Sequence, residues 1–136
     1  MQHPIFLVVV FLAGGTPLRA EVTNIDNLAL ERLLAGGVPV VDVRTPKEWN
    51  RTGVIKGSHL LTFFDSRGRY DVRAWMSELA AIAVPDEPIA IICHSGGRSN
   101  VVSRLLDRQF GYRRVHNVHG GIVQWIAEDR PTVNHR

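Results

Sequence analysis

Short apolar segments alternate along this chain with segments whose apolar residues recur every three or four positions. Nearly continuous short runs are typical of strands, and the wider spacing is typical of helices with one buried face. The predicted strands are residues 22–23, 38–43, 59–61, 89–92 and 115–118. Because strands and helices alternate, we expect an α/β fold, in which a central parallel sheet of about five strands is flanked by helices on both faces.

The starts of several predicted helices carry capping residues. Asp26 and Asp71 each precede an apolar-periodic segment, as N-caps do. Thr45, Pro46 and Glu48 match a capping box with proline at the first helical position. The helical spacing and the three tryptophans predict these buried positions: Leu30, Leu33, Leu34, Trp49, Val72, Trp75, Met76, Leu79, Ile82, Ala83, Val101, Val102, Leu105, Leu106, Ile122, Trp125 and Ile126.

Length and charge favour one domain without a nucleic-acid partner. The 136 residues suffice for one hydrophobic core. The net charge of +3 is spread along the chain, and Arg113–Arg114 is the single adjacent basic pair. His3, His59, His116, His119 and His135 show no metal-ligand spacing, so we expect neither a metal nor another cofactor.

The first twenty residues resemble an export signal. Residues 5–13 are uninterruptedly apolar, too short for a membrane helix of roughly 20 residues. With a small residue at Ala20, the run is typical of a signal-peptide core. We therefore expect residues 1–20 to be a signal peptide, residues 21–136 to form the domain, and the protein to be periplasmic or secreted without a stable membrane anchor. A buried first strand is the alternative, because no Lys or Arg precedes the run and Leu18 is large for its place.

The only cysteine, Cys93, follows the predicted strand 89–92 and opens the hexapeptide Cys-His-Ser-Gly-Gly-Arg. A single cysteine cannot form an internal disulfide. In an oxidising compartment, a reactive role for the thiol therefore explains its presence better than a structural one. Asp42 and Arg44 stand at the end of another predicted strand. Ligands of open parallel sheets bind beyond the carboxyl ends of the strands, where all three residues fall.

The loop after Cys93 contains the parts of an anion cradle. Glycines at 96 and 97 permit unusual backbone conformations, which let successive amides converge on one point. The helix after the loop contributes its dipole, and Arg98 contributes a permanent charge. Such surroundings favour a thiolate, a persulfide or a bound tetrahedral oxyanion at Cys93. The alternative is that Cys93 is a small buried apolar residue at a strand end.

The chain resembles the single-domain rhodanese family of sulfurtransferases, and with the expected signal peptide it resembles the periplasmic type. Matching segments are Asp42-Val43-Arg44 with Pro46, Glu48 and Trp49, then Gly53-Val54-Ile55-Lys56-Gly57-Ser58, the cysteine loop, and Gly120-Gly121 with Trp125. The resemblance implies a rhodanese-like fold and a thiosulfate sulfurtransferase activity. In it, a cysteine takes a sulfane sulfur from a donor such as thiosulfate and passes it to cyanide or a thiol acceptor.

By this resemblance Cys93 is the nucleophile and persulfide carrier, and Arg98 orients the loop and helps to bind an anionic donor. The remaining residues of the cradle, expected to bind substrate through their amides, are His94, Ser95, Gly96, Gly97 and Ser99. Related cysteine phosphatases and arsenate reductases place five residues between cysteine and arginine, where this chain has four. The shorter loop favours a single sulfur atom over an oxyanion, which leaves phosphatase or reductase chemistry as a minor alternative.

Several roles stay open at the level of sequence. We expect Asp42 to accept hydrogen bonds from loop amides and Arg44 to pair with Glu48 or another acid, both as supporting residues. Helix capping already explains Glu48. His94 either handles a proton or faces solvent. A further alternative is a sulfane-sulfur carrier that serves a protein thiol partner. The basic cluster, which either steers an anion or is a solvated surface, is Arg67, Arg69 and Arg73.

Overall fold

The computed structural model describes Gly14 and residues 21–135, so the predicted signal peptide lies, except for Gly14, outside the described residues. The described part forms five strands and five helices. In chain order they are β1 (Thr23–Ile25), α1 (Asn27–Ala35), β2 (Val40–Asp42), α2 (Pro46–Thr52), β3 (His59–Leu60), α3 (Val72–Leu79), β4 (Ile89–Ile92), α4 (Gly97–Gln109), β5 (Val115–Val118) and α5 (Gly121–Ala127).

The strands form one parallel sheet in the order β1-β5-β4-β2-β3. The strand that precedes Cys93, β4, is the central one, with β5 and β2 as its neighbours. All four residues of β4 are buried, as the continuous apolar pattern predicted. The expected α/β fold with a parallel sheet is confirmed, and the carboxyl ends of its strands meet at one edge.

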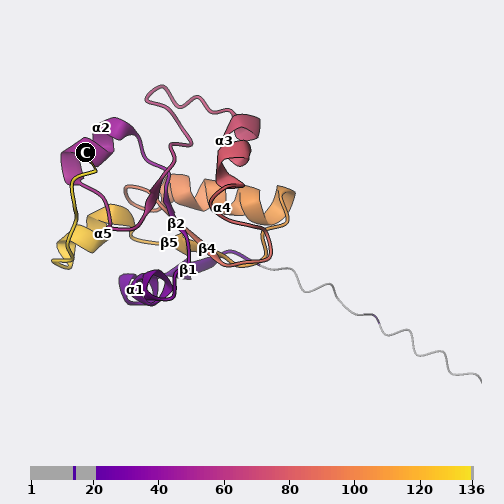
Figure 1. Ribbon diagram of the computed structural model, residues 1–136, viewed down its shortest axis with the longest axis horizontal. Coiled ribbons are helices and arrows are strands. Elements are labelled where there is room, and N and C mark those ends of the chain that lie inside the picture. The colour runs from indigo at the N-terminus through magenta and orange to yellow at the C-terminus, as the bar shows by residue number, and fades with distance from the viewer. Residues whose placement is uncertain (1–13, 15–20, 136) are drawn as a thin grey trace, which may run out of the picture.

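Helices cover both faces of the sheet (Figure 1). On one face, Ile91 and Cys93 pack with residues of α3 and α4. On the other, Ala90 and Ile92 pack with residues of α1 and α5. Alternate residues of β4 therefore enter different cores, and the Cys93 side chain belongs to the face that α4 covers.

The predicted caps are present at three helix starts. Asp26 accepts a hydrogen bond from the amide of Ala29 at 2.9 Å, and Asp71 accepts one from the amide of Ala74 at 3.0 Å. Thr45 and Glu48 form the expected reciprocal capping box at α2. The predicted tryptophan burial is also confirmed, because Trp49, Trp75 and Trp125 are each at most 8% exposed.

Helical spacing predicted one helix too long and two exposed residues as buried. The segment after Asp71 leaves the helix at Leu79 and continues in turns, where the amides of Ile82 and Ala83 both donate to the carbonyl of Leu79. Val101 and Ile126 are 53% and 41% exposed, not buried. Each lies next to a residue that does face the core, so the helix rotation leaves it at the margin of the apolar face.

The chain returns to α2 near its carboxyl end (Figure 1). Val54 and Val133 form an antiparallel bridge, and the Thr132 hydroxyl donates to the carbonyl of Thr52 at 2.9 Å. Across Gly14 and residues 21–135, no helix is both long and apolar enough to span a bilayer.

Candidate active site

Cys93 is the first residue after the central strand β4, at the carboxyl edge of the sheet. It is only 1% exposed, whereas His94, Ser95 and Gly97 of the same loop are exposed. Helix α4 begins at Gly97, four residues later. The sulfur therefore lies beneath a short loop whose His94 and Ser95 face solvent.

Two groups of the loop and helix contact the sulfur directly. The amide of Gly96 donates to Sγ at 3.2 Å. The Ser99 hydroxyl oxygen lies 3.2 Å from Sγ, within reach of the thiol hydrogen. Of the amides expected to cradle the sulfur, Gly96 is the one that bonds it here. Cys93 packs in the apolar cluster beneath α4, and Ser99 of α4 is also fully buried, so the sulfur has polar partners in an otherwise apolar layer.

The two loop glycines, expected to act alike, differ. Gly96 has φ +105°, and a Cβ there would stand 2.2 Å from the carbonyl oxygen of His119. Gly97 has no left-handed φ and open space at the Cβ position, so its expected backbone freedom is not used. Gly96 is thus the residue that turns the chain into α4 and brings its amide onto the sulfur.

The start of α5 supports the cysteine loop from behind. The amide of Ile122 donates to the carbonyl of Cys93 at 2.9 Å, and that of Val123 donates to the carbonyl of His94 at 3.1 Å. Gly121 permits this approach, because its Cβ would lie 2.3 Å from the His94 oxygen. Bonds to these two carbonyls fix the orientation of the first loop peptides. The sequence showed this glycine as part of the Gly120-Gly121 segment, without its contact with the cysteine loop.

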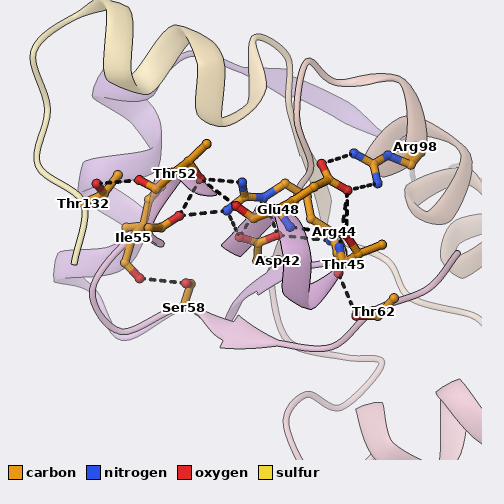
Figure 2. Close-up of polar contacts among 11 residues, drawn as sticks. Asp42, Arg44, Thr45, Glu48, Thr52, Ile55, Ser58, Thr62, Arg98 and Thr132 are labelled. Atoms are coloured by element: carbon orange, nitrogen blue, oxygen red, sulfur yellow. Dashed lines mark hydrogen bonds and ion pairs between the residues drawn. The ribbon is translucent and has the colours of Figure 1, made fainter. Parts of the chain in front are cut away.

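Arg98 forms a two-pronged ion pair with Glu48 of α2 (Figure 2). Its Nη1 and Nη2 lie 2.7 Å from Oε1 and Oε2 respectively, and both side chains are partly exposed. The Arg98 guanidinium lowers the pKa of Glu48 from 4.5 to about 2. The same hydrogen bonds raise the pKa of Arg98, and a negative charge on Cys93 raises it further. Helix capping therefore explains only part of the role of Glu48.

Arg44 was expected to pair with Glu48 or another acid, and its partner in the structure is Asp42. The pair is buried, with Nη2 of Arg44 2.8 Å from Oδ2 of Asp42. Asp42 also accepts from the Arg44 amide at 3.1 Å. Nη1 of Arg44 donates to the Thr52 hydroxyl (Figure 2). Nη2 also donates to the carbonyl of Gly53. Through these bonds the pair ties the end of β2 to the end of α2, beside the Arg98–Glu48 pair.

The structure leaves the other predicted residues at the surface. His94 and Ser95 are exposed. In the basic cluster, Arg69 pairs with Asp65 at 2.9 Å, whereas Arg67 and Arg73 form no ion pair within the described part of the chain. The cluster follows Thr62, whose hydroxyl donates to the carbonyl of Arg44, so this segment starts at the carboxyl edge of the sheet.

Sequence reasoning missed the residues that continue the contacts of Ser99. The Ser99 hydroxyl lies 2.6 Å from Oδ1 of Asn117, which is 2% exposed. The Asn117 amide nitrogen donates to Oδ1 of Asn24 at 3.0 Å. The signal was present as a polar residue within the buried strand 115–118. Neither its orientation nor its pairing with β1 could be read from the pattern.

Comparisons with known proteins define the family. Residues 27–128 match the model of the rhodanese-like domain. A sulfurtransferase of Allochromatium vinosum is 34% identical over 114 residues, 82% of this chain and 95% of that protein. Thiosulfate sulfurtransferase 18 of Arabidopsis thaliana is 28% identical over 116 residues, 82% of this chain and 83% of that protein. The crystal structure of a rhodanese-related protein from Thermoplasma volcanium aligns with a TM-score of 0.61 at 30% identity, over 83% of this chain and 99% of that one.

The chain therefore belongs to the family of rhodanese-like domains. The resemblance that the sequence motifs suggested is confirmed for family and fold, and sulfurtransferases are among the relatives. The matched region contains Cys93, the loop that follows it in the chain and the Arg98–Glu48 pair.

Proposed function

We propose that this protein is a thiosulfate sulfurtransferase that carries sulfur as a persulfide on Cys93. The Cys93 thiolate attacks the outer sulfur of thiosulfate and forms an S–S bond. The S–S bond of thiosulfate breaks, and its electron pair leaves with sulfite. A thiophile such as cyanide then attacks the outer persulfide sulfur, thiocyanate departs, and the bonding pair returns to the Cys93 thiolate.

The observation that carries this proposal is the contact of Sγ with the Gly96 amide at 3.2 Å, in a domain whose relatives include sulfurtransferases. A preorganised donor stabilises negative charge on sulfur without reorganisation during the reaction. Arg98 adds positive charge that interacts with Cys93. The turn at Gly96 also keeps the amide close to the sulfur, as expected for a site whose guest is one extra sulfur atom.

The test is to incubate the protein with thiosulfate, record its intact mass, then add cyanide and measure thiocyanate. Cys93→Ser is the control, because serine cannot hold a persulfide. We expect a gain of one sulfur atom, followed by its rapid loss as thiocyanate. Stable loading with negligible turnover would instead identify a sulfane-sulfur carrier for a protein thiol. Absence of loading would overturn the proposal and favour the alternative, phosphatase or reductase chemistry on an oxyanion.

We also propose that the protein is exported and that residues 1–20 are removed. Support comes from the apolar run of residues 5–13 followed by the small residue Ala20. Expression of the full chain in a bacterial host, followed by fractionation and N-terminal sequencing, tests this. We expect a periplasmic product that begins at Glu21. A product that stays in the cytoplasm with its first residues intact would contradict export.

A further inference from the structure

A chain of polar side chains leads from the sulfur of Cys93 through the protein to the edge strand β1. Sγ lies 3.2 Å from Ser99 Oγ, which lies 2.6 Å from Asn117 Oδ1. Asn117 Nδ2 then lies 3.0 Å from Asn24 Oδ1. Ser99 and Asn117 are 0% and 2% exposed, whereas Asn24 is exposed and borders a surface groove beside α4. We call these three residues, Ser99, Asn117 and Asn24, the relay.

The hydrogens of the relay fit a neutral thiol. The Cys93 S–H donates to Ser99 Oγ, and the single hydroxyl hydrogen of Ser99 donates to Asn117 Oδ1. The Asn117 amide nitrogen donates to Asn24. Every buried group in the relay then has a partner, as buried polar groups require.

An anion on Cys93 does not fit this arrangement. A thiolate or persulfide only accepts hydrogen bonds, so the Ser99 hydroxyl gains by turning its hydrogen toward the sulfur. That leaves Ser99 Oγ and Asn117 Oδ1 facing each other at 2.6 Å without a hydrogen between them. Two buried acceptors at this distance repel, which would oppose the ionised state that the chemistry needs.

A side-chain amide can remove this conflict, because one end of it accepts and the other donates. A half-turn of Asn117 about its Cβ–Cγ bond would point Nδ2 at Ser99 and Oδ1 at Asn24. Asn24 could then turn its own amide to donate, and its exposure leaves it free to exchange partners with water. Every buried donor and acceptor of the relay then has a partner, both with the thiol and with the anion.

We propose that Asn117 and Asn24 are positioning residues that reverse the hydrogen-bond direction of Ser99 when Cys93 becomes an anion. The inference rests on the proposed function, in which Cys93 alternates between thiol, thiolate and persulfide. The proton of the thiol leaves to solvent, and the relay carries none of it. The relay changes only which groups donate, so that Ser99 stabilises the thiol and the anion in turn.

Charged and titratable groups on the neighbouring elements are the same in every variant of the relay. Arg98 of α4, with its partner Glu48, carries a positive charge that interacts with a negative charge on Cys93. The others on the loop and the adjacent strands are His94, the Asp42–Arg44 pair of β2, and His116 of β5. None of them is altered by changes in the relay.

The test replaces Asn24, an exposed residue of an edge strand, in the otherwise intact protein. In Asn24→Asp the carboxylate can only accept, so it holds Asn117 in the direction that suits the thiol. In Asn24→Ala, Asn117 can still turn. Since the chain has one cysteine, the rate of alkylation by iodoacetamide against pH reports the ionisation of Cys93 alone. We expect the midpoint of this profile to rise by about one pH unit in Asn24→Asp and to move little in Asn24→Ala.

Thr23→Asp controls for the added negative charge. Thr23 is also exposed and adjacent on β1, but no hydrogen bond joins its side chain to the relay. The double variant Asn24→Asp/Asn117→Leu provides a second control, because leucine cannot transmit the effect. The inference requires a shift in Asn24→Asp that both controls lack. An equal shift in Thr23→Asp, a shift retained in the double variant, or no shift in Asn24→Asp would each overturn it.

Sulfur loading from thiosulfate is measured on the same variants to separate the two proposals. In Asn24→Asp we expect loading about fivefold slower at pH 7 than in the original protein, with the two rates converging above both midpoints. A midpoint shift without any sulfur loading in the original protein would reject the sulfurtransferase and retain the relay. Normal loading in every variant at every pH, with unchanged midpoints, would reject the relay and retain the sulfurtransferase.

Discussion

At the scale of single residues, the two glycines of the cysteine loop provide a matched pair. A side chain at Gly96 would meet the His119 carbonyl at 2.2 Å and would force a left-handed φ on a non-glycine residue. A side chain at Gly97 would meet open space at the start of α4. We expect Gly96→Ala to lose about 3 kcal/mol of unfolding free energy, and Gly97→Ala to be neutral or stabilising by about 0.5 kcal/mol.

Urea unfolding of the two glycine variants measures this difference. Because both substitutions add the same methyl group, they differ only in backbone conformation and space. Equal stabilities would contradict the assignment of the turn to Gly96.

The Glu48 carboxylate is a second feature of the residue scale, and its effect depends on pH. Its pKa is lowered from 4.5 to about 2 in the folded protein by hydrogen bonds from Arg98. A lowered folded-state pKa means that the stabilisation is complete above about pH 4.5 and is lost as pH falls toward 2. We expect Glu48→Gln to be less stable than the original protein by about 1 kcal/mol at pH 6, with the gap closing below pH 4.5.

Thermal unfolding of Glu48→Gln between pH 2 and pH 7 follows that gap. Glu78→Gln removes the same charge from an exposed position of α3 that forms no ion pair in the described residues. It should therefore show no comparable gap at any pH. A gap for Glu48→Gln that persists unchanged to pH 2 would show that the ion pair is not its cause.

At the scale of elements, the caps of α1 and α2 both stabilise a helix, but only the cap of α2 contacts a residue of the candidate site. Asp26 caps α1 by accepting from Ala29, on the face away from Cys93. Thr45 caps α2, and its hydroxyl also bonds Oε1 of Glu48, one of the two oxygens that bond Arg98. We expect Asp26→Ala and Thr45→Ala each to cost about 1 kcal/mol of stability. Only Thr45→Ala should slow sulfur loading severalfold, because only this cap orients Glu48.

Stopped-flow measurement of sulfur loading from thiosulfate compares the two rates, at a temperature where both capping variants are fully folded. Equal loading rates in the two variants would remove the link between the capping of α2 and the loop. A stability loss in Thr45→Ala without a change in rate would confine the residue to its capping role.

Local signals explain which parts of these elements could be predicted from the sequence. Caps depend on residues three positions apart, so Asp26, Thr45 and Asp71 marked helix starts correctly. Buried strands depend on short apolar runs, and β4 delivered Cys93 to the sheet edge as expected. Helix margins depend on rotation against the sheet, which the spacing alone does not define, and Val101 was misplaced for that reason.

Contacts across long sequence separations could not be predicted in the same way. Arg98 and Glu48 are 50 positions apart and meet only because α2 and the cysteine loop share one edge of the sheet. Asn117 and Asn24 are 93 positions apart and meet through the parallel pairing of β5 with β1. Each residue type suggested a polar contact, but the identity of the partner is a property of the strand order.

At the scale of the whole molecule, positive charge is placed at both edges of the sheet. Arg67 and Arg73 follow β3, in a segment that leaves the carboxyl edge where Cys93 lies. Arg113 and Arg114 precede β5, so they lie at the amino edge. An anion such as thiosulfate approaching Cys93 is therefore expected to feel the first pair more strongly, since charge interactions are screened over about 10 Å at 0.1 M salt.

The double variant Arg67→Gln/Arg73→Gln tests this steering. Arg69 is left in place, because its pairing with Asp65 already offsets its charge. We expect the KM for thiosulfate to rise about threefold at low ionic strength and its dependence on salt to flatten, since the removed charges no longer concentrate the donor near the loop. Arg113→Gln/Arg114→Gln makes the same change in net charge at the opposite edge and should leave KM unchanged. If both double variants raise KM equally, net charge alone attracts the donor. If neither does, the basic cluster after β3 is a solvated surface without a part in catalysis.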